Sequence, residues 1–325
     1  MMRAPDFWIK GGPLSLALAP AGWVWAMASA WRETFANPYR AAVPVVCIGN
    51  AVAGGAGKTP IALSLAEYLP GAHFLSLGYG GQEEGPLQVD VKKHSHTQVG
   101  DEPLLLADVA PCWVAKDRVA GAKRAAAKGA ACLVMDDGYQ NPSLRKDVSL
   151  LVVDGHVGFG NGRCMPAGPL REPIQRALSR ASAVVILGDD RTGVAARARA
   201  ARKPVLRAKL EPEAEASALA GQSVVAFAGI GRPEKFFKTL DSLGAKVIEA
   251  YSFPDHYSYK ASEIGELITI AETHAAALVT TSKDFVRVPI HQRDSIGVLQ
   301  IVVTWEDEDA LLDILRPVMK AGRPQ

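Results

Sequence analysis

The sequence predicts an α/β fold, in which a mostly parallel sheet is flanked by helices and accompanied by a smaller C-terminal α/β unit and an N-terminal apolar helix. Three observations lead to this prediction. Short apolar runs alternate with stretches of helical spacing, the order that gives parallel strands with helices on both faces. One apolar run leads into a glycine-rich turn and then a helix. A long uncharged segment precedes the first strand.

The uncharged N-terminal segment covers residues 11–31 and is followed by Arg32. About 20 apolar residues suffice to cross a bilayer. Pro20 and Gly22 weaken that interpretation, and the tryptophans of the segment favour the membrane–water interface. We therefore expect residues 1–32 to form a helix associated with a membrane surface on its cytoplasmic side, while a bilayer span and a buried core helix are the alternatives.

The main domain is expected over residues 33–220. Residues 43–48 have the composition of a buried strand, and residues 60–69 have helical spacing. Ala-, Lys- and Arg-rich stretches such as residues 119–128 predict surface helices. Further buried strands are predicted at residues 131–135, 149–153 and 183–187.

A quieter stretch over residues 189–220 separates the main domain from the smaller unit, which is expected over residues 221–325. There the alternation of elements starts again. The predicted elements are a strand at 223–228, a helix at 233–243 and strands at 247–250 and 277–280.

Composition narrows the function classes. The chain has 325 residues, and its 36 basic and 34 acidic residues leave a net charge of +2, which argues against a nucleic-acid binder. No Cys-x-x-Cys pair is present, so neither a zinc site nor a disulfide framework is predicted. Three of the four cysteines have apolar or small neighbours in the sequence and are expected to be reduced core thiols, in keeping with a reducing cytosol. The four are Cys47, Cys112, Cys132 and Cys164.

The glycine-rich turn after the first strand predicts a phosphate-binding loop. Its glycines let several backbone N–H groups point at phosphate oxygens, and the following helix offers its positive end. Lys58 is expected to neutralise the phosphates of a nucleoside triphosphate, and the Thr59 hydroxyl to bind Mg²⁺. Val52 stands where the general pattern has glycine. The residues expected to contact the nucleotide are Ala53, Gly54, Gly55, Ala56, Gly57, Lys58 and Thr59.

Acidic residues supply the candidate metal and catalytic groups. Asp136 and Asp137 follow a predicted buried strand, where carboxylates face the ligand crevice of an open α/β sheet and can hold or orient Mg²⁺. Asp101 begins a predicted helix, where an acid is often only an N-cap. His256 lies beside Asp255 in a loop, and such a histidine is either structural or able to move a proton.

A rigid loop over residues 166–173 contains Arg171 and Glu172. Arg171 could meet a phosphate and Glu172 could join the metal shell. A plain connecting loop is the equally open alternative.

Seven motifs, in order from about residue 43 to 287, together resemble the tetraacyldisaccharide 4′-kinase (lipid A 4′-kinase) family. In sequence they read Gly-Gly-x-Gly-Lys-Thr-Pro, Gly-Tyr-Gly-Gly, Gly-Asp-Glu-Pro, Asp-Asp-Gly-x-Gln, Pro-Ala-Gly-Pro-Leu-Arg-Glu-Pro, Phe-Pro-Asp-His and Thr-Thr-Ser-Lys-Asp.

The resemblance implies ATP- and Mg²⁺-dependent phosphorylation of the 4′-hydroxyl of an acylated glucosamine disaccharide 1-phosphate, at the inner membrane of Gram-negative bacteria. It implies that Asp101 and His256 form a catalytic dyad, in which Asp101, assisted by His256, accepts the hydroxyl proton. It also implies that the residues around the metal and the γ-phosphate include Asp136, Asp137, Gln140 and Glu172.

Two departures from the family pattern are Leu77, where arginine is common, and Asn141, where histidine is often found. The rival function class is a nucleotide switch, either a P-loop GTPase or a membrane-bound ATPase. The Asn-Lys-x-Asp motif that a GTPase uses for guanine is absent from the sequence. A kinase for another glycolipid or for a soluble sugar is the third possibility.

Overall fold

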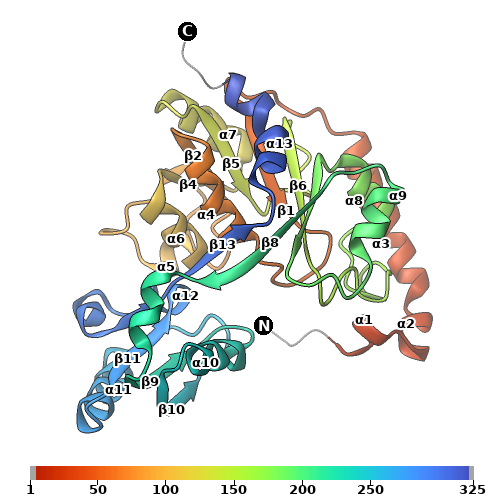
Figure 1. The fold of residues 1–325 in the computed structure, drawn as a ribbon. Helices are drawn as coiled ribbons and strands as arrows, with labels where there is room; N and C mark the ends of the chain where they lie inside the picture. The colour runs from red at the N-terminus through yellow and green to blue at the C-terminus, as the bar shows by residue number, and fades with distance from the viewer. Residues whose placement is uncertain (1–4, 322–325) are drawn as a thin grey trace.

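Two sheets organise the chain in the computed structural model, which describes residues 5–321. Over these residues the larger sheet has nine strands in the order β13-β8-β7-β6-β1-β5-β2-β4-β3, and the smaller has four in the order β10-β9-β11-β12 (Figure 1). The strands of the larger sheet are β1 (Val45–Gly49), β2 (Ala72–Ser76), β3 (Leu87–Gln88), β4 (Cys112–Val114), β5 (Cys132–Asp136), β6 (Val148–Asp154), β7 (Ala183–Leu187), β8 (Val205–Pro212) and β13 (Ile301–Trp305). Those of the smaller sheet are β9 (Ser223–Ala228), β10 (Lys246–Ser252), β11 (Ala277–Thr281) and β12 (Gly297–Leu299).

Helices cover both faces of the larger sheet, as the sequence predicts, and only its two edge strands β3 and β13 pair antiparallel. Along β1, Val46 and Ile48 belong to one core cluster, whereas Val45 and Cys47 belong to the other. This alternation is the two-residue period of a strand buried on both sides, and it explains the continuous apolar runs in the sequence. The helices of this domain are α4 (Lys58–Tyr68), α5 (His96–Val99), α6 (Asp101–Val109), α7 (Arg118–Ala127), α8 (Ile174–Arg180), α9 (Val194–Ala200) and α13 (Glu308–Ala321).

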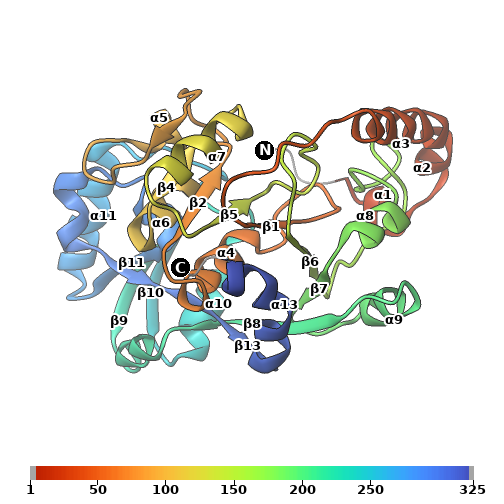
Figure 2. The same cartoon turned by 90° about the horizontal axis from the view of Figure 1, so that it is seen from above.

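The smaller sheet carries α10 (Pro233–Ser242), α11 (Ala261–Thr273) and the short α12 (Ser282–Phe285), with 3₁₀ turns η1 (Ala214–Leu219) and η2 (Ile290–Ser295) beside it. Three of its strands, β9, β10 and β11, and its helix α10 lie within two residues of the predicted positions, whereas β12 is not predicted. It lies at the opposite end of the larger sheet from the N-terminal helices (Figures 1 and 2).

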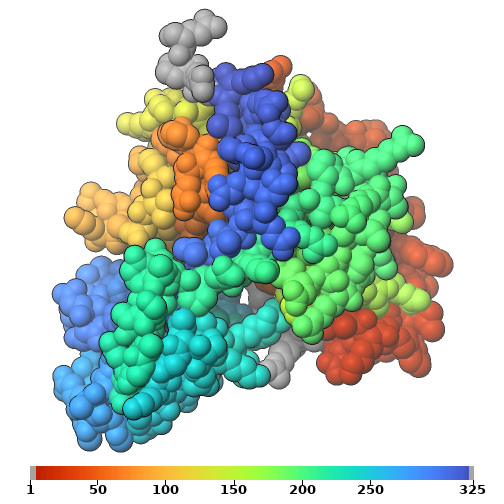
Figure 3. Space-filling view, in the orientation of Figure 1, coloured from red at the N-terminus to blue at the C-terminus, as the bar shows by residue number. Residues whose placement is uncertain are grey.

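The expectation that residues 221–325 form one unit needs correction at its C-terminal end. β13 pairs with β8 in the larger sheet, with Trp305 opposite Ala208. Helix α13 buries Leu311 and Leu315 in the same core cluster as β1. Figure 3 shows α13 lying across the main domain, away from the smaller unit. Residues 322–325 lie outside the described part of the chain.

The stretch over residues 189–220, which the sequence shows as featureless, contains α9 and β8. Four residues towards the C-terminal end of β8 are exposed or only partly buried, because this end extends beyond its pairing with β7 and pairs only with the edge strand β13. Residues 206–211 alternate apolar and polar side chains, the period of a strand buried on one face, and lack the continuous apolar run that identifies the central strands.

In place of the one N-terminal helix predicted over residues 1–32, the structure has three: α1 (Phe7–Lys10), α2 (Pro13–Ala17) and α3 (Ala19–Thr34). Gly11 and Gly12, both at positive φ, separate α1 from α2. None of the helices within residues 5–321 combines the length and apolar character needed to cross a membrane. Residues 1–4 of the predicted helix over 1–32 lie outside the described part of the chain.

All four cysteines are free and buried, one more than the three for which the sequence predicts a core thiol. Burial raises the pKa of the Cys47 and Cys132 thiols to about 11. These thiols are therefore protonated and unreactive near neutral pH.

Candidate active site

The phosphate-binding loop joins β1 to α4, in the strand–turn–helix context that the sequence predicts. Gly57 takes a left-handed conformation with φ 76°, and a Cβ there would stand 2.4 Å from Leu187 Cδ1, so only glycine fits. Val52 is 8% exposed and its backbone pairs with Leu170. Valine in place of glycine at position 52 therefore serves packing, because this part of the phosphate-binding loop pairs with the loop over residues 166–173.

Thr59 and Asp136 meet at the start of α4 and the end of β5. Thr59 Oγ1 donates to Asp136 Oδ2 at 3.2 Å, and both residues are buried. Burial, with the charge of Glu102 added to it, raises the pKa of Asp136 to about 7, although Lys58 and Thr59 act in the opposite direction. Asp136 Oδ1 has no hydrogen-bond partner among the described residues.

This arrangement fits Mg²⁺ bound to a nucleoside triphosphate. A buried carboxylate oxygen without a partner, next to a threonine hydroxyl, offers the hard oxygen ligands that Mg²⁺ prefers. Across residues 5–321, no group of three or more His, Cys, Asp or Glu side chains could hold a metal ion. Phosphate oxygens and water would therefore have to complete the coordination shell.

Asp137 lies between two cations. Lys58 Nζ is 3.5 Å from Asp137 Oδ1, and Arg171 Nη1 is 3.2 Å from the same oxygen. Asp137 has a positive φ of 50°, which is uncommon for a residue with a side chain. The sequence-predicted Lys58, Asp137 and Arg171 are thus brought together where the phosphates of a nucleotide would lie.

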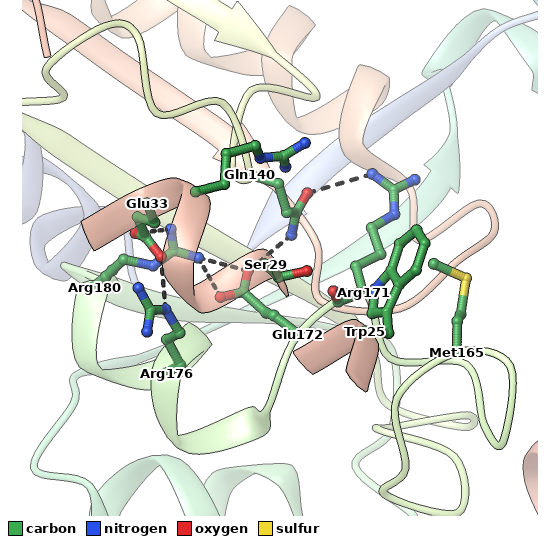
Figure 4. Close-up of a pocket in the computed structure, with 10 residues that line it drawn as sticks. Trp25, Ser29, Glu33, Gln140, Met165, Arg171, Glu172, Arg176 and Arg180 are labelled. Atoms are coloured by element: carbon green, nitrogen blue, oxygen red, sulfur yellow. Dashed lines mark hydrogen bonds and ion pairs between the residues drawn. The ribbon is translucent and has the colours of Figure 1, made fainter. Parts of the chain in front are cut away.

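Gln140 and Glu172 contact each other, and neither has a contact with Thr59 or Asp136 in the structure. Gln140 Nε2 donates to Glu172 Oε1 at 3.0 Å and to the Asn50 carbonyl at 2.8 Å. Both carboxylate oxygens of the buried Glu172 accept from Arg180 Nη2 (Figure 4). Because their polar atoms bind one another and Arg180, we do not propose Gln140 and Glu172 as metal ligands.

The pocket beside this network lies between α3 and the loop over residues 166–173, and encloses about 620 Å³, part of it open to solvent. Glu33 of α3 faces it and binds Arg176 and Arg180 of α8 (Figure 4). The residues that line it are Trp25, Ser29, Arg32, Glu33, Gln140, Met165, Arg171, Glu172, Arg176 and Arg180.

Asp101 and His256 are brought together from the two units. Asp101 Oδ2 lies 2.8 Å from His256 Nδ1, and Asp101 is 6% exposed. Burial acts to raise the pKa of Asp101, but the His256 hydrogen bond and the charges of His256 and Arg287 outweigh it and hold this pKa at about 2. The Asp101 contact in turn raises the pKa of His256 above its ordinary value, against an opposing effect of burial.

The loop carrying His256 is fixed by a buried network in the smaller unit. Asp284 accepts hydrogen bonds from the Gly229 amide at 2.8 Å and the Tyr259 hydroxyl at 2.7 Å. The Gly229 carbonyl accepts from the His256 amide at 3.1 Å and from Arg287 Nη1 at 2.9 Å. The Thr-Thr-Ser-Lys-Asp motif thus supports the histidine loop through its aspartate.

Glu102 connects the dyad to the phosphate loop. It follows Asp101 in α6, and its charge contributes to the raised pKa of Asp136 at the end of β5. Lys283 of the smaller unit lies 3.5 Å from Glu102. The dyad therefore lies next to a carboxylate that acts electrostatically on the Thr59–Asp136 pair.

Sequence reasoning missed Arg287 and Arg118. Arg287 is 3% exposed, and its Nε lies 3.4 Å from Asp101 Oδ2. Arg118 is 2% exposed, and its Nη1 has no hydrogen-bond partner among the described residues. Neither arginine belongs to a recognisable motif. Arg118 begins the basic helix α7, where nothing in the local sequence distinguishes a buried arginine from an exposed one. Their burial becomes visible only when the fold is assembled.

Comparisons with known proteins agree along almost the whole chain. The family model described as "Tetraacyldisaccharide-1-P 4′-kinase" matches residues 14–320. The tetraacyldisaccharide 4′-kinase of Rhodospirillum centenum is 51% identical, covering 98% of this chain and 97% of its own. That of Rhodospirillum rubrum is 50% identical, covering 97% and 98%.

A solved structure adds a three-dimensional comparison. LpxK from Aquifex aeolicus, crystallised in complex with ATP, superposes with a TM-score of 0.76 at 27% identity and covers 94% of this chain and 100% of its own. Together with the match of the family model and the two curated relatives, this likeness establishes that the chain belongs to the tetraacyldisaccharide-1-phosphate 4′-kinase family.

Proposed function

We propose that this protein transfers the γ-phosphate of ATP to the 4′-hydroxyl of a tetraacylated glucosamine disaccharide 1-phosphate. The observation that carries the proposal is the 2.8 Å contact between Asp101 and His256. This pair occurs together with a phosphate-binding loop in a member of this kinase family. A nucleotide-hydrolysing switch has no use for a proton acceptor directed at an alcohol, whereas a kinase requires one.

The phosphates would be held from three sides. The loop amides and the N-terminal end of α4 face the triphosphate, and Lys58 and Arg171 supply positive charge beside it. Asp137 holds these two cations in place in the structure, and they can turn to phosphate oxygens when ATP binds. Mg²⁺, held by Thr59 and Asp136, would offset charge on the transferring phosphate.

For the proton of the acceptor hydroxyl we propose His256 as the immediate acceptor within the Asp101–His256 pair, whereas the family resemblance implies Asp101 assisted by His256. A carboxylate whose pKa is about 2 is a weak proton acceptor. The imidazole is the stronger base, because the pKa of His256 is raised. Asp101 binds Nδ1 and would stabilise the imidazolium that forms, while Nε2, which lies 3.9 Å from Asp255 Oδ1, would face the substrate hydroxyl.

The N-terminal helices would hold the enzyme at the membrane surface that contains its acceptor. They expose a set of large apolar side chains that a soluble surface rarely gathers in one place. We propose peripheral or monotopic binding to the cytoplasmic face of the inner membrane of a Gram-negative cell, where ATP is available. The exposed side chains are Ile9, Leu14, Leu16, Trp23, Val24, Trp25, Met27, Trp31 and Phe35.

The proposal is tested by measuring transfer of ³²P from [γ-³²P]ATP with purified enzyme in detergent micelles. The tetraacyl disaccharide 1-phosphate is compared with its deacylated form and with acceptor-free enzyme. The expected result is labelling of the tetraacyl acceptor at the 4′-position. Release of inorganic phosphate at an equal rate without acceptor would instead indicate a nucleotide switch, and preferential labelling of the deacylated sugar would indicate a soluble-sugar kinase.

A further inference from the structure

We propose that Glu33, on the N-terminal helix α3, is a positioning residue of the phosphate-binding loop. The N-terminal helices then have a second role besides membrane contact, as a brace of the nucleotide site. This inference rests on the proposed function only for its activity measurements, because its effect on nucleotide binding is observable without a lipid acceptor. One set of contacts supports the role of Glu33, and a second, independent set supports the role of the N-terminal helices as a brace.

The first set is a chain of charged and polar side chains from α3 to the phosphate loop (Figure 4). Glu33 binds Arg180, and Arg180 binds both oxygens of Glu172. Glu172 accepts from Gln140 at 3.0 Å, and Gln140 donates to the Asn50 carbonyl at 2.8 Å. Three side chains therefore connect Glu33 to the loop.

Asn50 is the residue at which this chain acts on the phosphate loop. It follows β1 directly and is fully buried, and its Nδ2 donates to the Gly54 carbonyl at 3.0 Å. Gly54 has a φ of 121°, so its conformation depends on contacts of this kind. A shift of Gln140 would thus be transmitted to the glycines that face the triphosphate.

The second set runs through the backbone of the loop over residues 166–173. The side chains of Trp8, Ser15 and Trp25 donate hydrogen bonds to carbonyls of this loop, at Pro166 (3.0 Å), Ala167 (2.6 Å) and Arg171 (2.9 Å). The same loop is paired with the phosphate loop. The pairs are Ala53 N to the Pro169 carbonyl and Arg171 N to the Ala51 carbonyl, both at 2.7 Å.

The packing of α3 on this loop is also close. A Cβ at Gly22 would stand 2.8 Å from the carbonyl oxygen of Cys164, just before this loop. A residue with a side chain at position 22 would therefore not allow so close an approach of the helix. The same helix exposes Trp23 and Met27 on its other side, at 70% and 71%. Helix α3 thus presents apolar side chains outward and Glu33 inward.

Charge explains why Glu33 is the sensitive position of the chain. It binds Arg176 Nε at 2.7 Å as well as Arg180, and its own side chain is 25% exposed. Without its carboxylate, Arg176 loses its only carboxylate partner among the described residues, and Arg180 keeps only Glu172. Two neighbouring guanidinium groups then compete for Glu172, and the orientation that holds Gln140 is lost.

The experiment compares Glu33→Gln, which keeps the shape and removes the charge, with Met27→Gln on the outward side of the same helix. Binding of a fluorescent ATP analogue with Mg²⁺ is measured in detergent, and membrane binding by flotation with anionic vesicles. Glu33→Gln should raise the Kd for the nucleotide about 3- to 10-fold and leave flotation unchanged. Met27→Gln should reduce flotation and leave the Kd unchanged.

Two further measurements separate positioning from general stability. Glu33→Asp, which keeps the charge, should recover most of the nucleotide affinity, and Glu33→Gln should raise the KM for ATP without changing the KM for the lipid acceptor. In a Gln140→Ala background, Glu33→Gln should have no additional effect on the Kd, because both changes act on one chain of contacts.

The proposal is overturned if Glu33→Gln lowers the melting temperature but leaves the nucleotide Kd unchanged, or if its effect adds fully to that of Gln140→Ala. These outcomes differ from failure of the proposed function. In that case wild-type enzyme would not phosphorylate the lipid acceptor, whatever residue stands at position 33.

Discussion

Asp101 Oδ2 and His256 Nδ1 lie 2.8 Å apart, although they are 155 positions apart in the chain and belong to different units. Asp101 begins α6 of the main domain, and His256 lies in a loop of the smaller unit, at a positive φ of 60°. Such a conformation persists in a residue with a side chain when surrounding contacts hold it. The contact joins the main domain, which holds the phosphate-binding loop, to the imidazole of His256 that would accept a proton.

Lys58→Ala should lower kcat/KM for phosphoryl transfer by about 100-fold or more, because an aligned cation beside the transferring phosphate is lost. The assay is ³²P transfer to the lipid acceptor. Lys116→Ala is the matched control, since Lys116 binds Glu84 on the surface and its removal should leave the rate within about twofold. Equal losses in the two variants would contradict the assignment.

Binding of Mg²⁺·ATP should strengthen as the pH rises through about 7, because Mg²⁺ needs the ionised form of Asp136 and the pKa of this carboxyl is raised to about 7. Titration of a fluorescent nucleotide between pH 6 and pH 8.5 measures this. Asp136→Asn should bind more weakly and lose the pH dependence. A wild-type affinity that is flat over this range would argue against a metal role for Asp136.

The dyad should stabilise the protein within a defined pH window. The depressed pKa of Asp101 gives stability that is present above the unfolded pKa and is lost as the pH falls towards about 2. The raised pKa of His256 gives stability that is complete below its unfolded pKa of about 6.5 and is lost as the pH rises through the folded pKa.

His256→Ala should therefore reduce the free energy of unfolding more at pH 5.5 than at pH 9, as measured by urea titration. His291→Ala, which removes an exposed histidine of the same unit, should show no such difference. An equal loss at both pH values for His256→Ala would show that the pair contributes through packing alone.

Asp284→Ala should destabilise the smaller unit by about 3 kcal/mol, because it leaves the Gly229 amide without its partner and takes from the buried Arg287 one of its two carboxylates. Thermal unfolding followed by circular dichroism gives the change. The exposed Asp241 of α10 provides the control, and Asp241→Ala should cost less than about 0.5 kcal/mol. Near-equal melting temperatures for the two variants would contradict the role given to the network.

Replacing Trp23 and Trp31 by glutamine should reduce recovery of the protein with anionic vesicles, because both side chains are exposed and apolar. Flotation on a density gradient measures recovery, and ³²P transfer in detergent should remain within about threefold of wild type. Unchanged flotation would indicate that the apolar surface has another partner.

The sequence predicts the central strands well because β1, β5, β6 and β7 are buried on both faces and leave continuous apolar runs. It does not reveal β8, whose exposed side is polar. It also cannot show that β13 and α13 return to the larger sheet, since pairing of Trp305 with Ala208 is a long-range event without a local pattern.

The candidate active site, like the fold, can be predicted from the sequence only in part. Lys58 and Thr59 follow from local glycine spacing, whereas the pairing of Asp101 with His256 came only from the family resemblance. The network from Glu33 through Arg180 to Glu172 was not predicted at all. Ion pairs on a helix surface are common in sequences, and only the fold shows that these groups meet beside the phosphate loop.

The central claim is that Asp101 and His256 act as one unit in accepting the hydroxyl proton, and a double-mutant cycle on ³²P transfer tests it most directly. Asp101→Ala and His256→Ala should each lower kcat by about 100-fold or more, and the double variant should be no slower than the weaker single variant, because the two residues act as one unit. Near-full turnover of Asp101→Ala, or losses that multiply in the double variant, would contradict the account.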